Sequence, residues 1–249
     1  MLSGYYTIAS GMLASQRNLD TIGNNLINIQ TPGYRGERVL NSAFELELMT
    51  RRESTGNTVL GDGAGQVAAV VDDSVTMFDS GLLSDTGRAL DVAINGNGFF
   101  NIAAADGTTY LTRNGGFDLD EEGYLILPGY GRVLGDNGEI QVNTSDLSFL
   151  SDGTIQNADG QTLGRLLITA PADYADLTRN TNGMFTSENQ TGQAQNFEVV
   201  SQRLELSNVS MNREMTSLLD AQRSFQSCSS ALQIVDALNR KAAQQIAAI

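Results

Sequence analysis

The chain has 249 residues, 41% of them hydrophobic, and a formal net charge of −14. This length is enough for one large domain or two modest domains with a core, and the negative charge argues against nucleic acid and anionic membrane surfaces as partners. The lack of His excludes a Ser-His-Asp triad and a His-ligated zinc site, and the single Cys excludes an intramolecular disulfide. No run of 18 apolar residues predicts a membrane-spanning helix, and the first residues lack the features of a cleaved secretory signal.

Charge and glycine divide the chain into three parts. Residues 1–53 and 201–249 are close to neutral, whereas residues 54–200 carry twenty acidic and five basic side chains. Twenty of the 26 glycines lie between residues 57 and 200, and none follows residue 200. The sequence therefore predicts a Gly-rich acidic centre between two ends of different structure.

Residues 1–30 are predicted to form the first helix, because apolar residues recur at the a and d positions of more than three heptads, interrupted by Ser15. The helix is expected to end near Ile29 or Gln30, since Pro32 disfavours helix at the residue before it. Gly33 permits a turn with positive φ. The predicted packing residues are Tyr5, Ile8, Met12, Leu19, Ile22, Leu26 and Ile29.

Residues 31–60 are predicted to form a connecting turn and a short helix. Ser42 and Glu45 have the spacing of a capping box, which would open a helix that continues to about Arg52.

Residues 61–203 are predicted to form a mostly antiparallel β domain. Short apolar or alternating runs indicate strands at residues 66–71, 89–94, 98–102, 110–113, 124–127, 132–134 and 165–169. Tight hairpin turns are indicated by the pairs Asn95-Gly96, Asp106-Gly107, Asn137-Gly138, Asp152-Gly153, Asp159-Gly160 and Asn182-Gly183.

Residues 204–249 are predicted to form the C-terminal helix, with Ser210 as N-cap and no Gly or Pro in the 39 residues after it. Glu214 does not fit the apolar heptad pattern. The two helices could close a globular domain as an intramolecular pair, or they could also pack against neighbouring subunits, which their small, uncharged flanking residues favour. The predicted packing residues of this helix are Leu218, Phe225, Leu232, Val235 and Ile246.

Candidate chemistry is sparse. Residues 95–100 contain Gly-x-Gly without the continuation of a nucleotide-binding loop, so a hairpin is expected there. Residues 118–123 resemble the start of a calcium loop, but Gly129 stands where the bidentate Glu belongs, so an acidic turn is expected. The remaining enzyme option is a carboxylate pair for glycosidic or amide hydrolysis, for example among Asp85, Asp91 and Asp118, although the sequence does not determine the distances between them. We therefore predict no catalytic residue, no metal ion and no cofactor.

Four motifs follow one another along nearly the whole chain: NNLINIQTPGY at 24–34, GLLSDTGRALDVAINGNGFF at 81–100, YLTRNGGF at 110–117, and LSNV followed by Glu214-Met215 and AQRSF within 206–225. Together they resemble the flagellar basal-body rod and hook protein family, and they are most similar to its distal and proximal rod proteins. Ile27 departs from the family pattern, which usually has Ala there. The matching residues include Asn24, Asn25, Asn28, Thr31, Pro32, Gly33, Tyr34, Gly87, Leu90, Asp91, Gly96, Gly98, Phe99, Arg113, Gly115, Asn208, Gln222 and Arg223.

The resemblance implies an α+β fold in which the N- and C-terminal helices pair as a coiled-coil layer and the central, mostly antiparallel β domain forms an outer layer. It implies a structural subunit of the bacterial flagellar basal-body rod, which self-assembles into the hollow axial drive shaft and transmits torque, and not an enzyme. The alternatives are a hook-type or other axial subunit and, from another class, a secreted cell-wall glycan hydrolase.

The same resemblance sets the expected partners and location. The partners would be copies of the chain, other rod proteins, the hook protein and ring proteins, with no nucleic acid, membrane insertion or small-molecule substrate. The family is exported by the flagellar type III apparatus without a cleaved signal peptide. A basal-body location outside the cytoplasmic membrane therefore replaces the cytosolic one that the missing signal alone would indicate.

Overall fold

The computed structural model describes residues 2–43, 69–105, 107–144, 146–180, 183–187, 189 and 191–246. The chain forms two units, and it passes between them four times. We call the first the helical unit; it contains Met1–Leu26, Glu37–Thr76 and Ser210–Ile249. We call the second the β unit; it contains Ile27–Gly36 and Met77–Val209.

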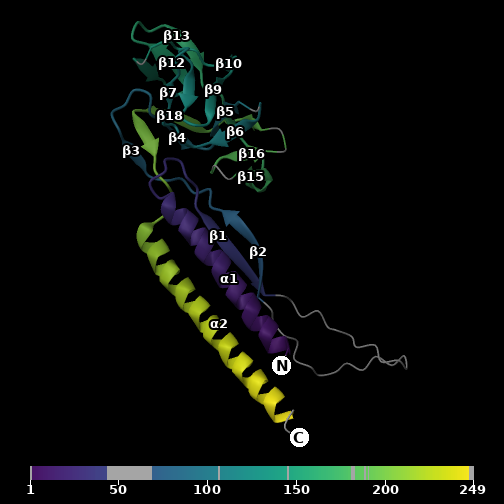
Figure 1. The fold of residues 1–249 in the computed structure, drawn as a ribbon. Helices are drawn as coiled ribbons and strands as arrows, with labels where there is room; N and C mark the ends of the chain where they lie inside the picture. The colour runs from purple at the N-terminus through teal and green to yellow at the C-terminus, as the bar shows by residue number, and fades with distance from the viewer. Residues whose placement is uncertain are drawn as a thin grey trace, which may run out of the picture. The chain divides into compact units, whose positions relative to one another are not determined.

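The helical unit contains two long helices and one two-stranded ribbon. Helix α1 spans Leu2–Ile27 and helix α2 spans Met211–Ile246. Figure 1 shows the two helices side by side and antiparallel. Strands β1 (Glu37–Ala43) and β2 (Ala69–Thr76) pair antiparallel, with an irregularity between Leu40 and Asn41. In the described part of the chain, neither helix has the length and apolarity needed to cross a membrane.

The helix boundaries differ slightly from the expected ones. Helix α1 ends at Ile27, because the chain then turns and the Asn28 carbonyl accepts a hydrogen bond from Thr31 N–H (3.1 Å). Helix α2 begins at Met211, directly after Ser210, whereas residues 203–205 belong to a strand.

The short helix expected from the capping box is not present at its first residues. Ser42 and Ala43 lie in β1, where they pair with Val70 and Ala69 of β2. The pairing with a strand that is distant in sequence outweighs the local helix signal. Glu45 and the rest of the expected helix lie outside the described residues.

The β unit is built from short antiparallel strands. Its largest sheet has the path β15-β16-β6-β5-β9-β8-β7, with β10 paired to β9 and with β14 joining β5 to β17. A three-stranded sheet β11-β12-β13 and the pairs β18-β4 and β19-β3 accompany it. The strands are β3 (Leu83–Asp85), β4 (Val92–Gly96), β5 (Phe99–Ala104), β6 (Thr109–Thr112), β7 (Asp118–Leu119), β8 (Leu125–Leu127), β9 (Gly131–Gly135), β10 (Gly138–Glu139), β11 (Leu147–Phe149), β12 (Thr154–Asn157), β13 (Thr162–Arg165), β14 (Ile168–Ala170), β15 (Leu177–Arg179), β16 (Phe185–Ser187), β17 (Gly192–Gln193), β18 (Phe197–Ser201) and β19 (Arg203–Glu205).

The core of the β unit forms where the apolar faces of these sheets meet. Phe100, Ile102, Phe117, Leu125 and Val133 are among its fully buried side chains. A smaller aromatic cluster surrounds Phe99, Leu111 and Phe185. Each fully buried side chain of this size contributes roughly 1.5–3 kcal/mol relative to an exposed one, so the β unit has its own source of stability.

Most of the Asn-Gly and Asp-Gly pairs lie where hairpins turn. Gly107, Gly153, Gly160 and Gly183 have positive φ between consecutive paired strands, and Gly138 has positive φ as the first residue of β10, although Asp106 and Asn182 themselves lie outside the described residues.

The hairpin expected at Asn95-Gly96 is wrong. Strand β4 pairs with β18, and β5 pairs with β6, β9 and β14, so β4 and β5 are consecutive but not partners. Gly96 and Gly98 instead permit the close approach of other segments, the Asn196 main chain and the Ile168 side chain respectively.

Candidate functional site

A buried carboxylate lies between two guanidinium groups in the β unit. Glu205, at the end of β19, is 1% exposed and forms ion pairs with Arg35 (2.8 Å) and Arg113 (3.2 Å). We call these three residues the Glu205 cluster. Burial lowers the pKa of the Arg113 guanidinium, and the neighbouring Glu205 carboxylate opposes that change. Charged side chains buried this deeply are compatible with a stable fold only when each of them is paired and hydrogen-bonded.

The Glu205 cluster also holds main-chain segments. Arg113 donates hydrogen bonds to the carbonyl groups of Ile94 (3.2 Å) and Gly96 (2.7 Å), and its guanidinium lies 5.3 Å from the centre of the Phe99 ring. Arg35 donates to the Asp79 carbonyl group, while Glu205 Oε1 accepts from Gly81 N–H (2.8 Å). The cluster therefore connects segments that are far apart in the sequence.

Asn208 joins three segments with one side chain. Its Oδ1 accepts a hydrogen bond from Gly36 N–H (2.7 Å), and its Nδ2 donates to the carbonyl groups of Met77 (2.8 Å) and Asp79 (3.0 Å). Gly36, Met77 and Asn208 each lie within two residues of a point where the chain leaves or enters the β unit. Asn208 therefore fixes these ends of the β unit to one another.

The turn at Thr31-Pro32-Gly33 belongs to the β unit. Gly33 has φ 68° and donates a hydrogen bond from its N–H to the Glu205 carbonyl group (2.7 Å). A Cβ atom at this position would overlap the main chain of Arg113 and Asn114. The glycine is thus required both by its backbone conformation and by the approach of another segment.

Asn25 performs a similar role in the helical unit. This side chain on α1 is 1% exposed; its Oδ1 accepts from Glu37 N–H (2.9 Å) and its Nδ2 donates to the Glu37 carbonyl group (2.8 Å). Asn25 Nδ2 also lies 3.5 Å from Glu214 Oε2. Glu214, which does not fit the heptad pattern of α2, is therefore a buried partner of the N-terminal motif.

The contacts between α1 and α2 have one consistent antiparallel register. Ser15 Oγ bonds the Gly11 carbonyl group (2.9 Å) and lies 3.2 Å from Ser224 Oγ, while Asn25 meets Glu214. Moving ten residues along α1 thus corresponds to moving ten residues back along α2. Ser15, the expected interruption of the seam, is itself a contact between the helices.

The predicted packing residues of the helices have mixed environments. Tyr5 is exposed, Ile29 follows α1 in the β unit, and Ile246 is the last residue of α2. The predicted packing residue that is buried is Ile22, whereas those that are half-buried are Ile8, Met12, Leu19, Leu26, Leu218, Phe225, Leu232 and Val235. Their role between copies remains a prediction.

Several large apolar side chains of the helices are exposed. On α2, Leu219 is 54% exposed, Ile234 62% and Leu238 59%, and Leu13 on α1 is 53% exposed. These residues lie outside the predicted seam. The helical unit therefore presents apolar surface on faces that α1 and α2 do not cover.

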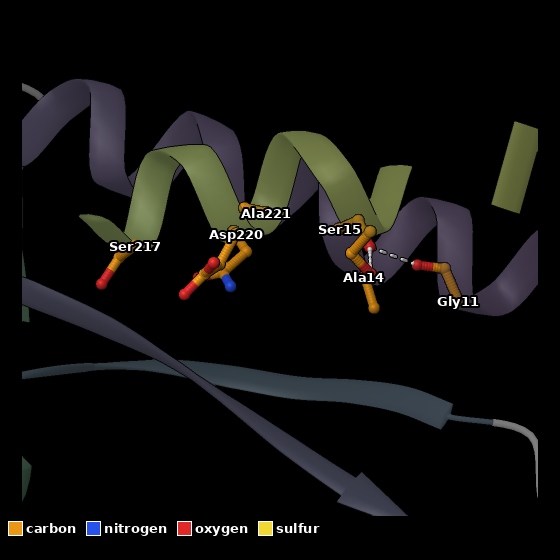
Figure 2. A pocket seen from close by; sticks show the side chains of 8 residues that line it. Gly11, Ala14, Ser15, Ser217, Asp220 and Ala221 are labelled. Carbon is orange, nitrogen blue, oxygen red and sulfur yellow. Dashed lines mark hydrogen bonds between the residues drawn. The ribbon is translucent and has the colours of Figure 1, made fainter. Parts of the chain in front are cut away.

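A groove of about 450 Å³ lies along the helix pair. Figure 2 shows Ala14 of α1 and Ser217 and Asp220 of α2 directed to the same side. Short side chains predominate in its lining, which consists of Gly11, Ala14, Ser15, Asn18, Ser217, Asp220, Ala221 and Ser224.

The acidic turn at residues 118–123 connects β7 and β8, and one cation, Arg132, offsets part of its negative charge. Arg132 forms ion pairs with Glu122 (2.6 Å), Glu139 (2.9 Å) and Asp120 (3.1 Å). Desolvation acts to raise the pKa of Asp120, but hydrogen bonds from Tyr124 and Glu122 N–H and the charge of Arg132 outweigh it and lower that pKa.

The three acids considered for hydrolysis have different surroundings. Asp91 is buried and lies 3.5 Å from Arg88, whereas Asp85 on β3 and Asp118 on β7 are exposed. Within the described ranges, no group of three or more Asp, Glu, His or Cys side chains is arranged to hold a metal ion.

The remaining motif residues divide between the two units. Thr31 Oγ1 donates to Asn28 Oδ1 (3.1 Å), and the Arg179 guanidinium lies 4.5 Å from the centre of the buried Tyr34 ring.

In the motifs at residues 81–117, Leu90 is buried and Gly87 has positive φ. A Cβ atom on Gly115 would overlap the Val92 main chain. Asn24, Gln222 and Arg223 are exposed on the helices.

Arg35, Glu205 and Glu214 were not among the predicted site residues. Arg35 follows a recognised motif and Glu205 precedes one, but no local pattern pairs charges that are so far apart in sequence. Glu214 had two signals in the sequence, since it interrupts the apolar heptad pattern and, with Met215, matches the family motif of the C-terminal helix.

Three segments along the chain match models of flagellar protein families. Residues 6–35 match the family described as "Flagella basal body rod protein", residues 93–156 match "Flagellar hook protein FlgE/F/G D1 domain", and residues 200–245 match "Flagellar basal body rod FlgEFG protein C-terminal".

Individual relatives match over almost their full length. The chain is 33% identical to flagellar basal-body rod protein FlgG of Bacillus subtilis over 91% of this chain and 92% of the relative. It is 30% identical to FlgG of Borreliella burgdorferi over 95% of this chain and 96% of the relative. It is 28% identical to flagellar basal-body rod protein FlgF of Caulobacter vibrioides over the whole of both chains.

Replacing Gly33 should destabilise the β unit more than replacing a glycine with similar φ and open surroundings. Gly107 has φ 81° and no atom within 4 Å of a Cβ position, so Gly107→Ala should cost about 1–2 kcal/mol of left-handed strain alone. Gly33→Ala should cost about 1–3 kcal/mol more, because the overlap with the Arg113 main chain adds to the strain. Denaturant unfolding of the two full-length variants measures the difference. Equal losses of unfolding free energy in the two variants would contradict the close approach of the Arg113 main chain to Gly33.

Removing the charge of Glu205 should be severe. Glu205→Gln leaves Arg35 and Arg113 buried without a carboxylate, so the free energy of unfolding should fall by about 3–5 kcal/mol. The matched control is Glu122→Gln, because this partner of Arg132 is 68% exposed and the loss should be at most about 1 kcal/mol. Thermal and denaturant unfolding provide the measurement, and a Glu205 variant as stable as the control would show that the cluster is not needed.

Proposed function

The chain belongs to the flagellar basal-body rod protein family and is a structural subunit of the bacterial flagellar basal-body rod, and we propose that its copies self-assemble into the hollow axial shaft that transmits torque. The observation that carries this proposal is the set of exposed apolar side chains on α2. Leu219, Ile234 and Leu238 are each more than half exposed, and Ile234 and Leu238 lie one helical turn apart on the same face. Burial of these side chains against neighbouring copies would remove their apolar surface from water.

The helices are the proposed inner layer of the shaft, and the β unit is the proposed outer layer. The antiparallel contact of α1 with α2 supports the pairing of the chain's two ends. The nearly neutral charge of residues 1–53 and 201–249 supports close packing of many copies, whereas the acidic residues 54–200 suit a solvated exterior. The half-buried seam residues Leu26 and Leu232 would complete their burial against neighbouring copies.

A growing shaft requires contacts between two different surface patches of each subunit, because identical patches would close a dimer. The partners we propose are copies of the chain, other rod proteins, the hook protein and ring proteins. The proposed route is export without a cleaved signal peptide to the basal body outside the cytoplasmic membrane. Catalysis forms no part of the proposal, and neither the hook-type nor the hydrolase alternative gains support from the named relatives.

A charge on the exposed apolar surface should block assembly without unfolding the subunit. Ile234→Asp changes a side chain that is 62% exposed, so the free energy of unfolding should change by no more than about 0.5–1 kcal/mol. In the shaft the same carboxylate would be buried without a partner, which is strongly unfavourable. Motility in soft agar and electron microscopy of basal bodies should reveal short or absent rods.

The neighbouring exposed residue provides the control. Gln233→Asp introduces the same charge and the same helix propensity one position earlier, on a different face of α2. It should impair motility less than Ile234→Asp does. Normal swimming of the Ile234 variant would contradict the proposal that this surface is covered in the rod.

A further inference from the structure

Helix α2 extends beyond the part of α1 that it contacts. In the register set by Ser15 with Ser224 and by Asn25 with Glu214, the first residue of α1, Leu2, lies level with residue 237 of α2. Helix α2 continues to Ile246. Residues 238–246, which we call the α2 extension, therefore lie beyond the described residues of α1.

The α2 extension presents an apolar side chain and a cation on one face. Leu238 is 59% exposed, and Lys241, three residues later and also exposed, lies next to it on the helix surface. Positions 237, 238, 244 and 245, three and four residues from Lys241, hold no acid. Arg240 differs, since Asp236 lies four residues before it. Lys241 is thus a cation without an acidic neighbour on its own helix.

The groove along the helix pair has the complementary character. Gly11, Ala14 and Ala221 give it an open floor of small residues, and Asp220 is the one charged residue in its lining. Figure 2 shows the Asp220 side chain directed to the groove side of the helices. Among the described residues, no ion pair joins this carboxylate to Arg223, which follows three residues later on α2 and does not line the groove.

We propose that the α2 extension of one copy lies in the groove of a second copy, with Leu238 on the floor of small residues and the Lys241 ammonium group against the Asp220 carboxylate. This inference rests on the proposed function, because it requires assembly of the chain with itself. A copy cannot fill its own groove, since 21 residues of helix separate Asp220 from Lys241 by about 31 Å. The groove and the extension are two different patches, so the contact is heterologous and can repeat along a shaft.

A zero-length cross-link tests this contact directly. In isolated basal bodies, a water-soluble carbodiimide activates a carboxylate, and a nearby lysine amine displaces the activating group as a urea to leave an amide bond. Lys241 is the only lysine of the chain, so its cross-links identify their partner without ambiguity. We expect mass spectrometry of the digest to find Lys241 joined to Asp220. The 31 Å separation means that such a link must connect two copies.

The outcomes separate this inference from the proposed function. Basal bodies that contain the chain but in which Lys241 is linked to other carboxylates, or to none, would overturn the groove contact and leave the rod assignment intact. Basal bodies that lack the chain would overturn both.

A charge exchange provides a second measurement. Asp220→Lys and Lys241→Asp should each reduce the number of complete rods by about tenfold or more, because each places like charges together. The double variant should restore assembly, because the ion pair is re-formed in reverse. Asp20→Lys is the control, since this exposed acid on α1 does not line the groove. A double variant as defective as either single variant, or an equal loss in the control, contradicts the proposal.

Discussion

The charge of the buried Glu205 carboxylate must be neutralised. The arrangement of the β unit near the points where the chain enters and leaves it depends on this requirement. Two guanidinium groups supply the charge, and the same three side chains bind the main chain at Asp79, Gly81, Ile94 and Gly96. Asn208 adds bonds to Gly36 and Met77. The polar groups therefore hold together segments that no continuous sheet connects, while the apolar core stabilises the strands around them.

The sequence was sufficient for features that local chemistry determines. The long Gly-free segment after Ser210 predicted α2, and the Asp-Gly and Asn-Gly pairs marked hairpins such as the one at Gly153, because the backbone conformation of a turn depends on a few adjacent residues. Pairing between distant strands has no such signal. The capping box at Ser42 suggested helix where the partner strand β2 imposes β structure, and residues 95–98 suggested a hairpin between two strands that each pair elsewhere.

The candidate site was predictable as a set of motif residues but not as a set of contacts. Asn25, Gly33, Arg113 and Asn208 were recognised by pattern, yet each acts mainly on the main chain of a remote segment. Of their charged partners, Glu214 was marked by the motif of the C-terminal helix, whereas no sequence pattern pairs Arg35 with Glu205. Gln222 and Arg223 are exposed, and nothing in the structure of a single chain explains their presence in the motif.

The β unit is discontinuous in sequence, and this has a consequence for the order in which the chain can fold. Gly36 and the Asn208 amide that bonds it are 172 residues apart, and Arg35 meets its carboxylate only when residue 205 is available. Because a chain is synthesised from its N-terminus, nearly all of it exists before either contact can form. Closure of such long loops is slow compared with local helix formation. The contacts of Arg35 and Gly36 can therefore form only after residues 205 and 208 have been made, so this part of the β unit is completed just before the last helix follows.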